Sequence, residues 1–211
     1  LDEIQFAPEA PSVIKYLSDH YPIKFIVTGS SSFYLKNAFS ESLAGRKKIF
    51  ELYPLDFGEY LTFRNITYSV QDWEKSKFNK SEHARLTNYY EDFITYGGFP
   101  QVVLAGSTQD KQDLLADIMS SYINVDVRTL ADFGDGRNIF NLIKLLASRV
   151  GSRVDVSKLA QLSGLSRPTI TNYLEFLEKT YLIATVSVHT NSVDREIVKA
   201  RKLYFGDTGL A

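Results

Sequence analysis

The chain has 211 residues, 44% of them hydrophobic and 23% charged, with 24 basic and 25 acidic side chains. This composition is typical of a globular protein with a real core, and its charge balance excludes a chain-wide field that would attract nucleic acid or an anionic membrane. The chain has no cysteine, which excludes disulfides and thiol chemistry. No apolar run approaches the roughly 20 residues of a membrane-spanning helix, so we expect a cytoplasmic protein without a membrane partner.

The N-terminal part of the sequence predicts a partial α/β core. Residues 10–22 have the spacing of a short amphipathic helix, and residues 23–33 begin with an apolar run that ends in a glycine and three serines. A continuous apolar run is typical of a strand covered on both faces, and a helix followed by such a strand is half of a βαβ unit. Beyond a break at Gly45, the pattern predicts a strand at about 48–53 and a helix that opens near Pro54.

The middle of the chain is predicted to be helical. Residues 64–85 are polar and weakly patterned, which indicates a loop or insertion. From about residue 83 two helical stretches follow, separated by the break at 97–100. The segment 134–138 is the clearest candidate for an internal linker, and residues 138–151 form a strongly apolar helix.

The best local signal is a helix-turn-helix near the C-terminal end. Gly164 supplies a turn between two short amphipathic stretches, Ser166 is placed as an N-cap, and Pro168 falls in the first turn of the second helix. The second helix then has a core-facing stripe at i, i+3, i+4 and i+7, made of Ile170, Tyr173, Leu174 and Leu177. A predicted strand pair follows, so the unit is expected to be winged-helix-like.

This unit allows two functions. It could contact DNA, because arginine and asparagine can read base edges and lysine can bind phosphate. The candidate residues for that contact are Arg167, Thr169, Asn172, Lys199, Arg201 and Lys202. Glu175 and Glu178 on the same helix oppose phosphate, so a packing or protein-contact role is the alternative.

Other chemistry is poorly supported. Gly29 and the serines after it lack the second glycine of a hydrolase nucleophile turn. The three histidines are scattered, which also argues against zinc. The acidic pair Asp2–Glu3 is either a solvated turn or the end of an ATPase strand, in which Asp holds Mg²⁺ and Glu polarises the attacking water. The second interpretation requires a loop of the form G-x-x-x-x-G-K-[ST], and the 211 residues contain none.

Taken in order, several stretches resemble one protein family. They are "LDEIQ", "FIVTGSSSF", "ESLAGR", "ELYPLDFGEYL", "YGGFPQVVL", "LASRVGS", "LSGLSRPTITNYLEFLEKTYLI" and "KARKLYFGDTGLA". The chain resembles the prokaryotic AAA+-type (P-loop) ATP-binding proteins that carry a C-terminal domain of unknown function. The resemblance implies a fragment from the middle of such a protein, without the phosphate-binding loop and without most of a nuclease-like domain.

The resemblance also implies roles for single residues. Asp2 would coordinate Mg²⁺ and Glu3 would activate water. Thr28 and Ser30 would lie where the γ-phosphate is sensed, and Arg46 would neutralise charge in the transition state. The turn residues Gly97, Gly98 and Pro100 would lie near the adenine, although a plain helix break explains them equally well.

The expected fold class is α/β plus mostly helical, with a partial P-loop-type core, a helical lid and a winged helix-turn-helix. The expected domains are 1–63, the partial AAA+ core; 64–134, loop and helical lid; 135–203, the winged helix; and 204–211, the start of a further domain. The expected function is ATP binding, with Mg²⁺ as cofactor and hydrolysis only in the intact parent, so this fragment should bind nucleotide very weakly at most. The alternative is a winged-helix module that binds DNA or a protein, with the α/β part as scaffold.

Overall fold

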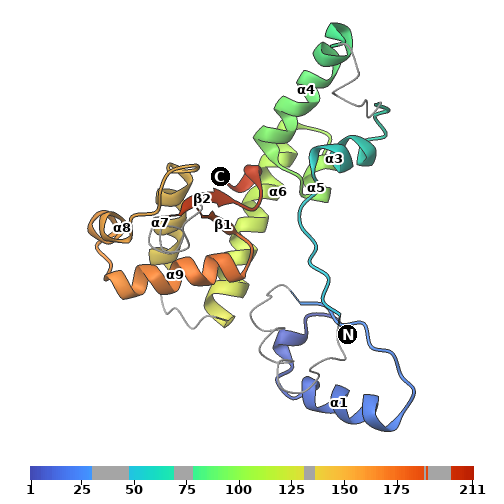
Figure 1. Ribbon diagram of the computed structural model, residues 1–211, viewed down its shortest axis with the longest axis vertical. Coiled ribbons are helices and arrows are strands. Elements are labelled where there is room, and N and C mark those ends of the chain that lie inside the picture. Colours follow the sequence, from blue (N-terminus) through green and yellow to red (C-terminus); the bar gives the residue numbers. More distant parts are fainter. Residues whose placement is uncertain (30–47, 69–77, 131–135, 188, 190–200) are drawn as a thin grey trace. The chain divides into compact units, whose positions relative to one another are not determined.

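The computed structural model describes most of the chain and is predominantly helical (Figure 1). The described residues are 1–29, 48–68, 78–130, 136–187, 189 and 201–211. They divide into two compact parts, one made of 1–52 and 156–184 and the other of 53–155 and 185–211. Among the described residues, the only regular sheet pairs β1 (Ile183–Val186) with β2 (Lys202–Phe205).

The first part begins with a short 3-10 turn, η1 (Ile4–Phe6), and the helix α1 (Ala10–His20). The helix predicted at 10–22 is therefore confirmed. Ile4 and Ile14 are buried and form a small core, against which Phe25 and Val27 pack.

The strand predicted from residue 23 is wrong as stated. The described residues 23–29 form no regular strand, and their burial alternates: Phe25 and Val27 face the small core, whereas Ile26 is 76% exposed. A strand that is apolar throughout needs a layer on each face, and the described residues supply one only on the side of α1.

The strand predicted at about 48–53 is also not observed. These residues form no regular strand, and Phe50 and Leu52 are strongly exposed. A strand is stabilised by its neighbours in the sheet, and none of the described residues pairs with this segment in a sheet.

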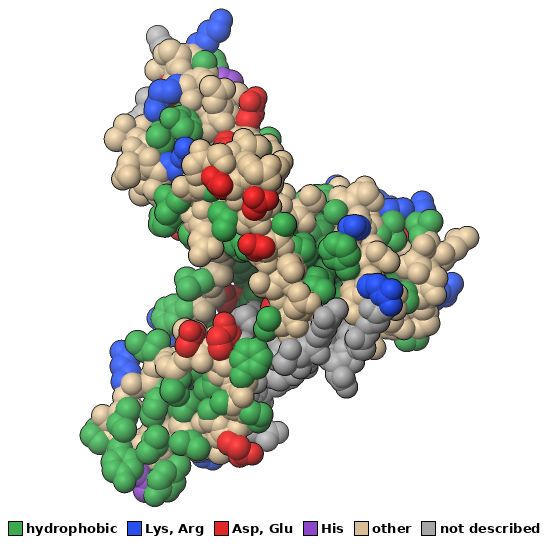
Figure 2. Space-filling model, turned by 180° about the vertical axis from the view of Figure 1, so that it is seen from behind, with side chains coloured by type: hydrophobic (Ala, Val, Ile, Leu, Met, Phe, Trp, Pro, Cys, Tyr) green, Lys and Arg blue, Asp and Glu red, His purple; other side chains and the backbone are tan. Residues whose placement is uncertain are grey.

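Figure 2 shows hydrophobic side chains gathered on the visible surface of the part that contains α1.

The predicted helix-turn-helix is confirmed as two helices, α8 (Val156–Ser163) and α9 (Arg167–Lys179). Gly164 has φ 72°, a left-handed conformation that glycine adopts without a steric penalty. The Ser166 side chain caps α9 by accepting the N–H of Thr169 at 3.2 Å. On the predicted stripe Ile170, Tyr173 and Leu177 are buried and Leu174 is half-buried. The predicted wing falls mostly on residues 188 and 190–200, outside the described residues.

Replacing Ser166 by alanine tests this cap. The change removes the acceptor for an N–H group of the first turn, so we expect α9 to lose about 1 kcal/mol of stability. Amide hydrogen exchange of Thr169 should speed up relative to amides in the middle of α9. Ser157→Ala, an exposed serine on α8, is the matched control and should leave α9 unchanged.

The second part is built from helices whose bounds follow. They are α3 (Phe57–Phe63), α4 (Lys80–Tyr96), α5 (Pro100–Leu104), α6 (Thr108–Ser121), the π-helical η2 (Tyr122–Leu130), α7 (Gly136–Ala147) and the 3-10 turn η3 (Thr208–Leu210). The helical predictions for this region are confirmed, but the predicted linker 134–138 is wrong at its end, because α7 already begins at Gly136 and ends at Ala147 rather than at 151. The predicted loop 64–85 is wrong at its end, because α4 begins at Lys80. The missed signal is Asn79, whose side chain accepts the N–H groups of Ser81 and Glu82.

Packing in this part centres on α3. Tyr60 and Leu61 are almost completely buried, together with Val103 of α5, and aromatic side chains of α3 and α4 surround them. The start of α3 is fixed by a capping box, in which Asp56 accepts the Glu59 N–H and Glu59 accepts the Asp56 N–H. The capping box thereby fixes the direction in which the chain enters α3.

Candidate functional site

The first residues of the chain lie beside residues 26–28. The Leu1 amino group donates to the Ile26 carbonyl at 3.0 Å, and the Thr28 N–H donates to the Leu1 carbonyl at 2.9 Å. These two bonds on either side of Val27 are the pattern of a parallel pair. Asp2 and Thr28 thus both follow the paired residues on their own segments, at the same end.

Glu3 interrupts this pairing. Its backbone is left-handed, with φ 49° and ψ 49°, and the N–H of Ile4 rather than that of Glu3 reaches the Thr28 carbonyl, at 3.1 Å. Glu3 is thus the residue at which the chain leaves the pair and enters η1, for which it is the N-cap. A left-handed glutamate is also a costly conformation that the surrounding structure must maintain.

The side chains of Asp2 and Thr28 are in direct contact, because the Thr28 hydroxyl donates a hydrogen bond to Asp2 Oδ1. Both side chains and Glu3 are exposed to solvent. An exposed carboxylate beside a hydroxyl fits Mg²⁺, which takes oxygen ligands and is usually held by one or two carboxylates together with phosphates and water. The structure therefore brings together the side chains of Asp2 and Thr28, with Glu3 next in the chain, whereas Ser30 and Arg46 lie outside the described residues. Within the described ranges, no group of three or more His, Asp or Glu side chains converges on a metal-sized site.

The predicted adenine-contact residues Gly97, Gly98 and Pro100 lie at the turn between α4 and α5. The space beside both glycines is filled by other groups of the chain. A Cβ at Gly97 would overlap the Asp207 carboxylate, and a Cβ at Gly98 would overlap the Leu55 carbonyl. Gly97 has φ 78° and ψ −166°, a region that is essentially restricted to glycine. Nucleotide contact at this turn stays a prediction.

Asp207 is a buried residue that the sequence analysis missed. One carboxylate oxygen accepts the Gly98 N–H at 2.7 Å, and the other accepts the Gly209 N–H at 2.8 Å. Burial raises the pKa of Asp207 above its ordinary value, although both N–H groups act in the opposite direction. The local signal was the sequence Asp-Thr-Gly, in which an aspartate accepts an N–H two residues further on.

Asp92 of α4 is the centre of a second missed cluster. It accepts hydrogen bonds from Lys111 of α6 at 2.5 Å and from Tyr60 of α3 at 2.5 Å, and Arg64 lies 3.3 Å from it. Burial alone would raise the pKa of Asp92, but the hydrogen bonds from Lys111 and Tyr60 and the two positive charges hold it below its usual range. Burial, followed by Asp92, raises the pKa of Tyr60 to about 12. The cluster joins three helices through one carboxylate.

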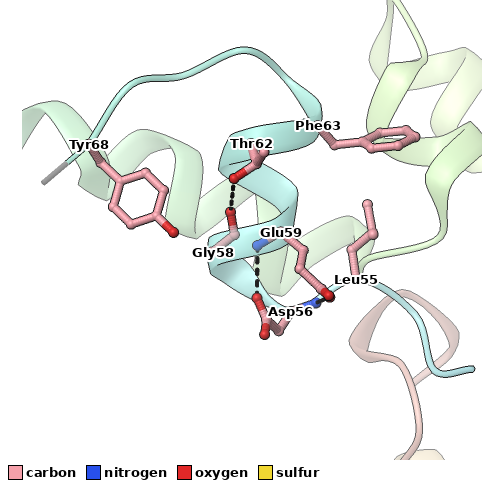
Figure 3. Close-up of a pocket in the computed structure, with 7 residues that line it drawn as sticks. All are labelled: Leu55, Asp56, Gly58, Glu59, Thr62, Phe63 and Tyr68. Atoms are coloured by element: carbon pink, nitrogen blue, oxygen red, sulfur yellow. Dashed lines mark hydrogen bonds between the residues drawn. The ribbon is translucent and has the colours of Figure 1, made fainter. Parts of the chain in front are cut away.

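A hollow of about 460 Å³ lies beside α3 (Figure 3). It is lined by Leu55, Asp56, Gly58, Glu59, Thr62, Phe63 and Tyr68. Asp56 and Glu59 use their carboxylates in the capping box, and the Thr62 hydroxyl donates to the Gly58 carbonyl at 2.9 Å. The Asp56, Glu59 and Thr62 side chains of the hollow therefore stabilise α3.

The candidate nucleic-acid residues lie on two elements. On α9, Arg167 and Asn172 are exposed and Thr169 is half-buried, and the exposed Glu175 and Glu178 share that helix. Arg201 and Lys202 are exposed at the start of β2. Lys199 lies outside the described residues. The α9 surface thus combines groups that can read bases with charges that repel phosphate.

Two protein-family models match this chain, one in its N-terminal segment and one in its C-terminal part. Residues 1–61 match the family model described as AAA domain, which is an ATPase-like class. The chain belongs to the family described as Domain of unknown function (DUF8612), whose model matches residues 87–211.

Relatives occur in archaea and bacteria. An uncharacterized protein of Methanocaldococcus jannaschii is 29% identical over 211 residues, which are 98% of this chain and 46% of the relative. An uncharacterized protein of Haemophilus influenzae is 28% identical over 187 residues, 86% of this chain and 43% of the relative. An uncharacterized protein of Mycobacterium tuberculosis is 24% identical over 214 residues, which cover 100% of this chain and 42% of the relative. The chain thus spans less than half the length of these relatives. No solved structure matches it.

In the ranges that the structure describes, no helix is long and apolar enough to cross a membrane.

Proposed function

We propose that these residues supply the metal-binding and water-polarising groups of an AAA-type ATPase, with hydrolysis carried out by the intact parent protein. The observation that supports this most is the contact between Asp2 and Thr28 at the end of a parallel backbone pair. Ligands of parallel α/β sheets bind at the carboxyl ends of the strands. The match of residues 1–61 to the AAA domain supports the same class.

In this proposal each residue has a distinct task. Asp2 holds Mg²⁺, and the Thr28 hydroxyl orients the Asp2 carboxylate through its hydrogen bond. Glu3, whose left-handed backbone turns the chain into η1, polarises the attacking water. Mg²⁺ bound with ATP supplies neutralisation of the charge on the phosphates. Ser30 as a second sensor, Arg46 as the transition-state arginine, and Gly97, Gly98 and Pro100 beside the adenine complete the proposal. The α8–α9 pair with β1 and β2 is proposed as a winged helix.

Turnover of ATP by the intact parent protein tests this assignment. We expect Glu3→Gln to lower kcat by roughly 100-fold or more, because it removes the base and keeps the side-chain shape. Asp2→Asn should raise the Mg²⁺ concentration needed for half-maximal turnover, because an amide is a weaker ligand than a carboxylate.

Glu9→Gln is the matched control, since Glu9 is an exposed acid near the start of α1, and it should leave both quantities unchanged. Unaltered turnover in Glu3→Gln would contradict the proposed role of the acidic pair.

A further inference from the structure

Three segments that are far apart in sequence meet at Gly98. Its N–H donates to Asp207 Oδ2 at 2.7 Å, and its carbonyl accepts the Leu55 N–H at 2.9 Å. Leu55 lies in the segment that matches the AAA domain, whereas Gly98 and Asp207 lie in the segment that matches the family's domain of unknown function. Both backbone polar groups of Gly98 therefore connect the two matched segments, within one compact part of the structure.

Other groups of the chain fill the space beside Gly98 and its neighbours. A Cβ added at Gly98 would overlap the Leu55 carbonyl, one at Gly97 would overlap the Asp207 carboxylate, and one at Gly209 would overlap the Tyr96 carbonyl at the end of α4. In addition, the Thr208 hydroxyl donates to the Phe93 carbonyl at 3.2 Å. Figure 1 shows the C-terminal turn η3 lying against α4. Close packing of this kind transmits displacements rather than absorbing them.

We propose that Gly98 is a coupling joint between the AAA-matching segment and the domain of unknown function, with Asp207 as the positioning residue. When the segment that leads into α3 shifts, Gly98 shifts with it, and Asp207 passes the shift to η3. Asp207 suits this task because each carboxylate oxygen holds one N–H, so that the turn and η3 are fixed by the same side chain. This inference does not depend on the proposed ATPase function.

Amide hydrogen exchange of the 211-residue chain tests the joint. Asp207→Asn keeps the shape of the side chain but leaves only one acceptor for two N–H groups. We expect exchange at Gly98 and Gly209 to accelerate about tenfold or more, which is the scale of one lost charged hydrogen bond. The decisive site is the Leu55 amide, which does not contact Asp207 and should accelerate as well.

A double-mutant cycle with Leu55→Ala decides between coupling and general destabilisation. Coupling requires a reciprocal effect, so that Leu55→Ala accelerates exchange at Gly209 and the two changes together are non-additive. Asp117→Asn makes the same chemical change at an exposed position of α6, and its cycle with Leu55→Ala should be additive. An additive cycle for Asp207, or a Leu55 amide that keeps its protection in Asp207→Asn, would overturn the joint.

Discussion

Replacing Gly98 by alanine is expected to destabilise the part formed by α3, α4, α5 and η3 by about 3 kcal/mol or more. The new methyl group would overlap the Leu55 carbonyl oxygen and lie 2.9 Å from the Leu55 nitrogen. These are backbone atoms, so no side-chain rotation can relieve the overlap. The Leu55–Gly98 hydrogen bond must lengthen or break. Denaturant unfolding followed by far-UV circular dichroism measures the loss.

Two other glycines of the chain separate the possible causes of this effect. Gly106→Ala has open space around the new methyl group and no left-handed backbone, so it should change stability by less than about 1 kcal/mol. Gly164→Ala also has open space, but its φ of 72° adds backbone strain alone, worth about 1 kcal/mol. If Gly98→Ala lost no more stability than Gly164→Ala, the Leu55 backbone would be able to move away from the new methyl group at little cost, which contradicts the prediction.

The helices of this protein could be predicted because their signals are local. The apolar spacing of α9, the Ser166 cap and the Gly164 turn all lie within a few residues of one another, and the structure has each of them. The strands near residues 23 and 48 could not be placed in the same way. Whether a strand residue is buried depends on the neighbouring strands and layers, which are distant in sequence. The apolar Ile26, for example, is largely exposed.

The polar clusters could not be predicted for a different reason. Asp207 contacts Gly98, which lies 109 positions away in the sequence. Asp92 contacts Lys111, which lies 19 positions away on another helix. In sequence Lys111 belongs to a polar run, which predicts a solvated face, yet it is only 6% exposed. A periodic pattern cannot tell a buried ion pair from a surface charge. By contrast, the sequence alone indicates the acidic pair Asp2–Glu3, and the structure adds the contact between Asp2 and Thr28.

The second large effect is expected at Asp92. Asp92→Asn removes the negative charge that compensates Lys111, whose side chain is only 8% exposed. An uncompensated buried charge is strongly destabilising, and we expect a loss of about 3 kcal/mol in the free energy of unfolding. Lys111→Met should cost less, about 1 kcal/mol, because Asp92 is 25% exposed and keeps its contacts with Tyr60 and Arg64.

The double variant Asp92→Asn/Lys111→Met should be more stable than Asp92→Asn alone, since it no longer buries an unpaired ammonium group. The matched control is Glu175→Gln, which breaks an exposed ion pair with Lys179 at 3.4 Å and should change stability by less than about 0.5 kcal/mol. If Lys111→Met lost as much stability as Asp92→Asn, the difference in burial between the Lys111 and Asp92 side chains would not explain the effects of the two substitutions.

The pH dependence of this effect follows from the lowered pKa of Asp92. A carboxyl whose pKa is lower in the folded state stabilises the fold above its unfolded pKa, about 3.9, and loses that contribution as the pH falls through the folded pKa. The stability gap between the wild type and Asp92→Asn should therefore be full at neutral pH and narrow steadily below about pH 4. Unfolding measured at several pH values checks this directly. A gap that stays constant into acid would mean that the charge of Asp92, as distinct from its hydrogen bonds, contributes nothing.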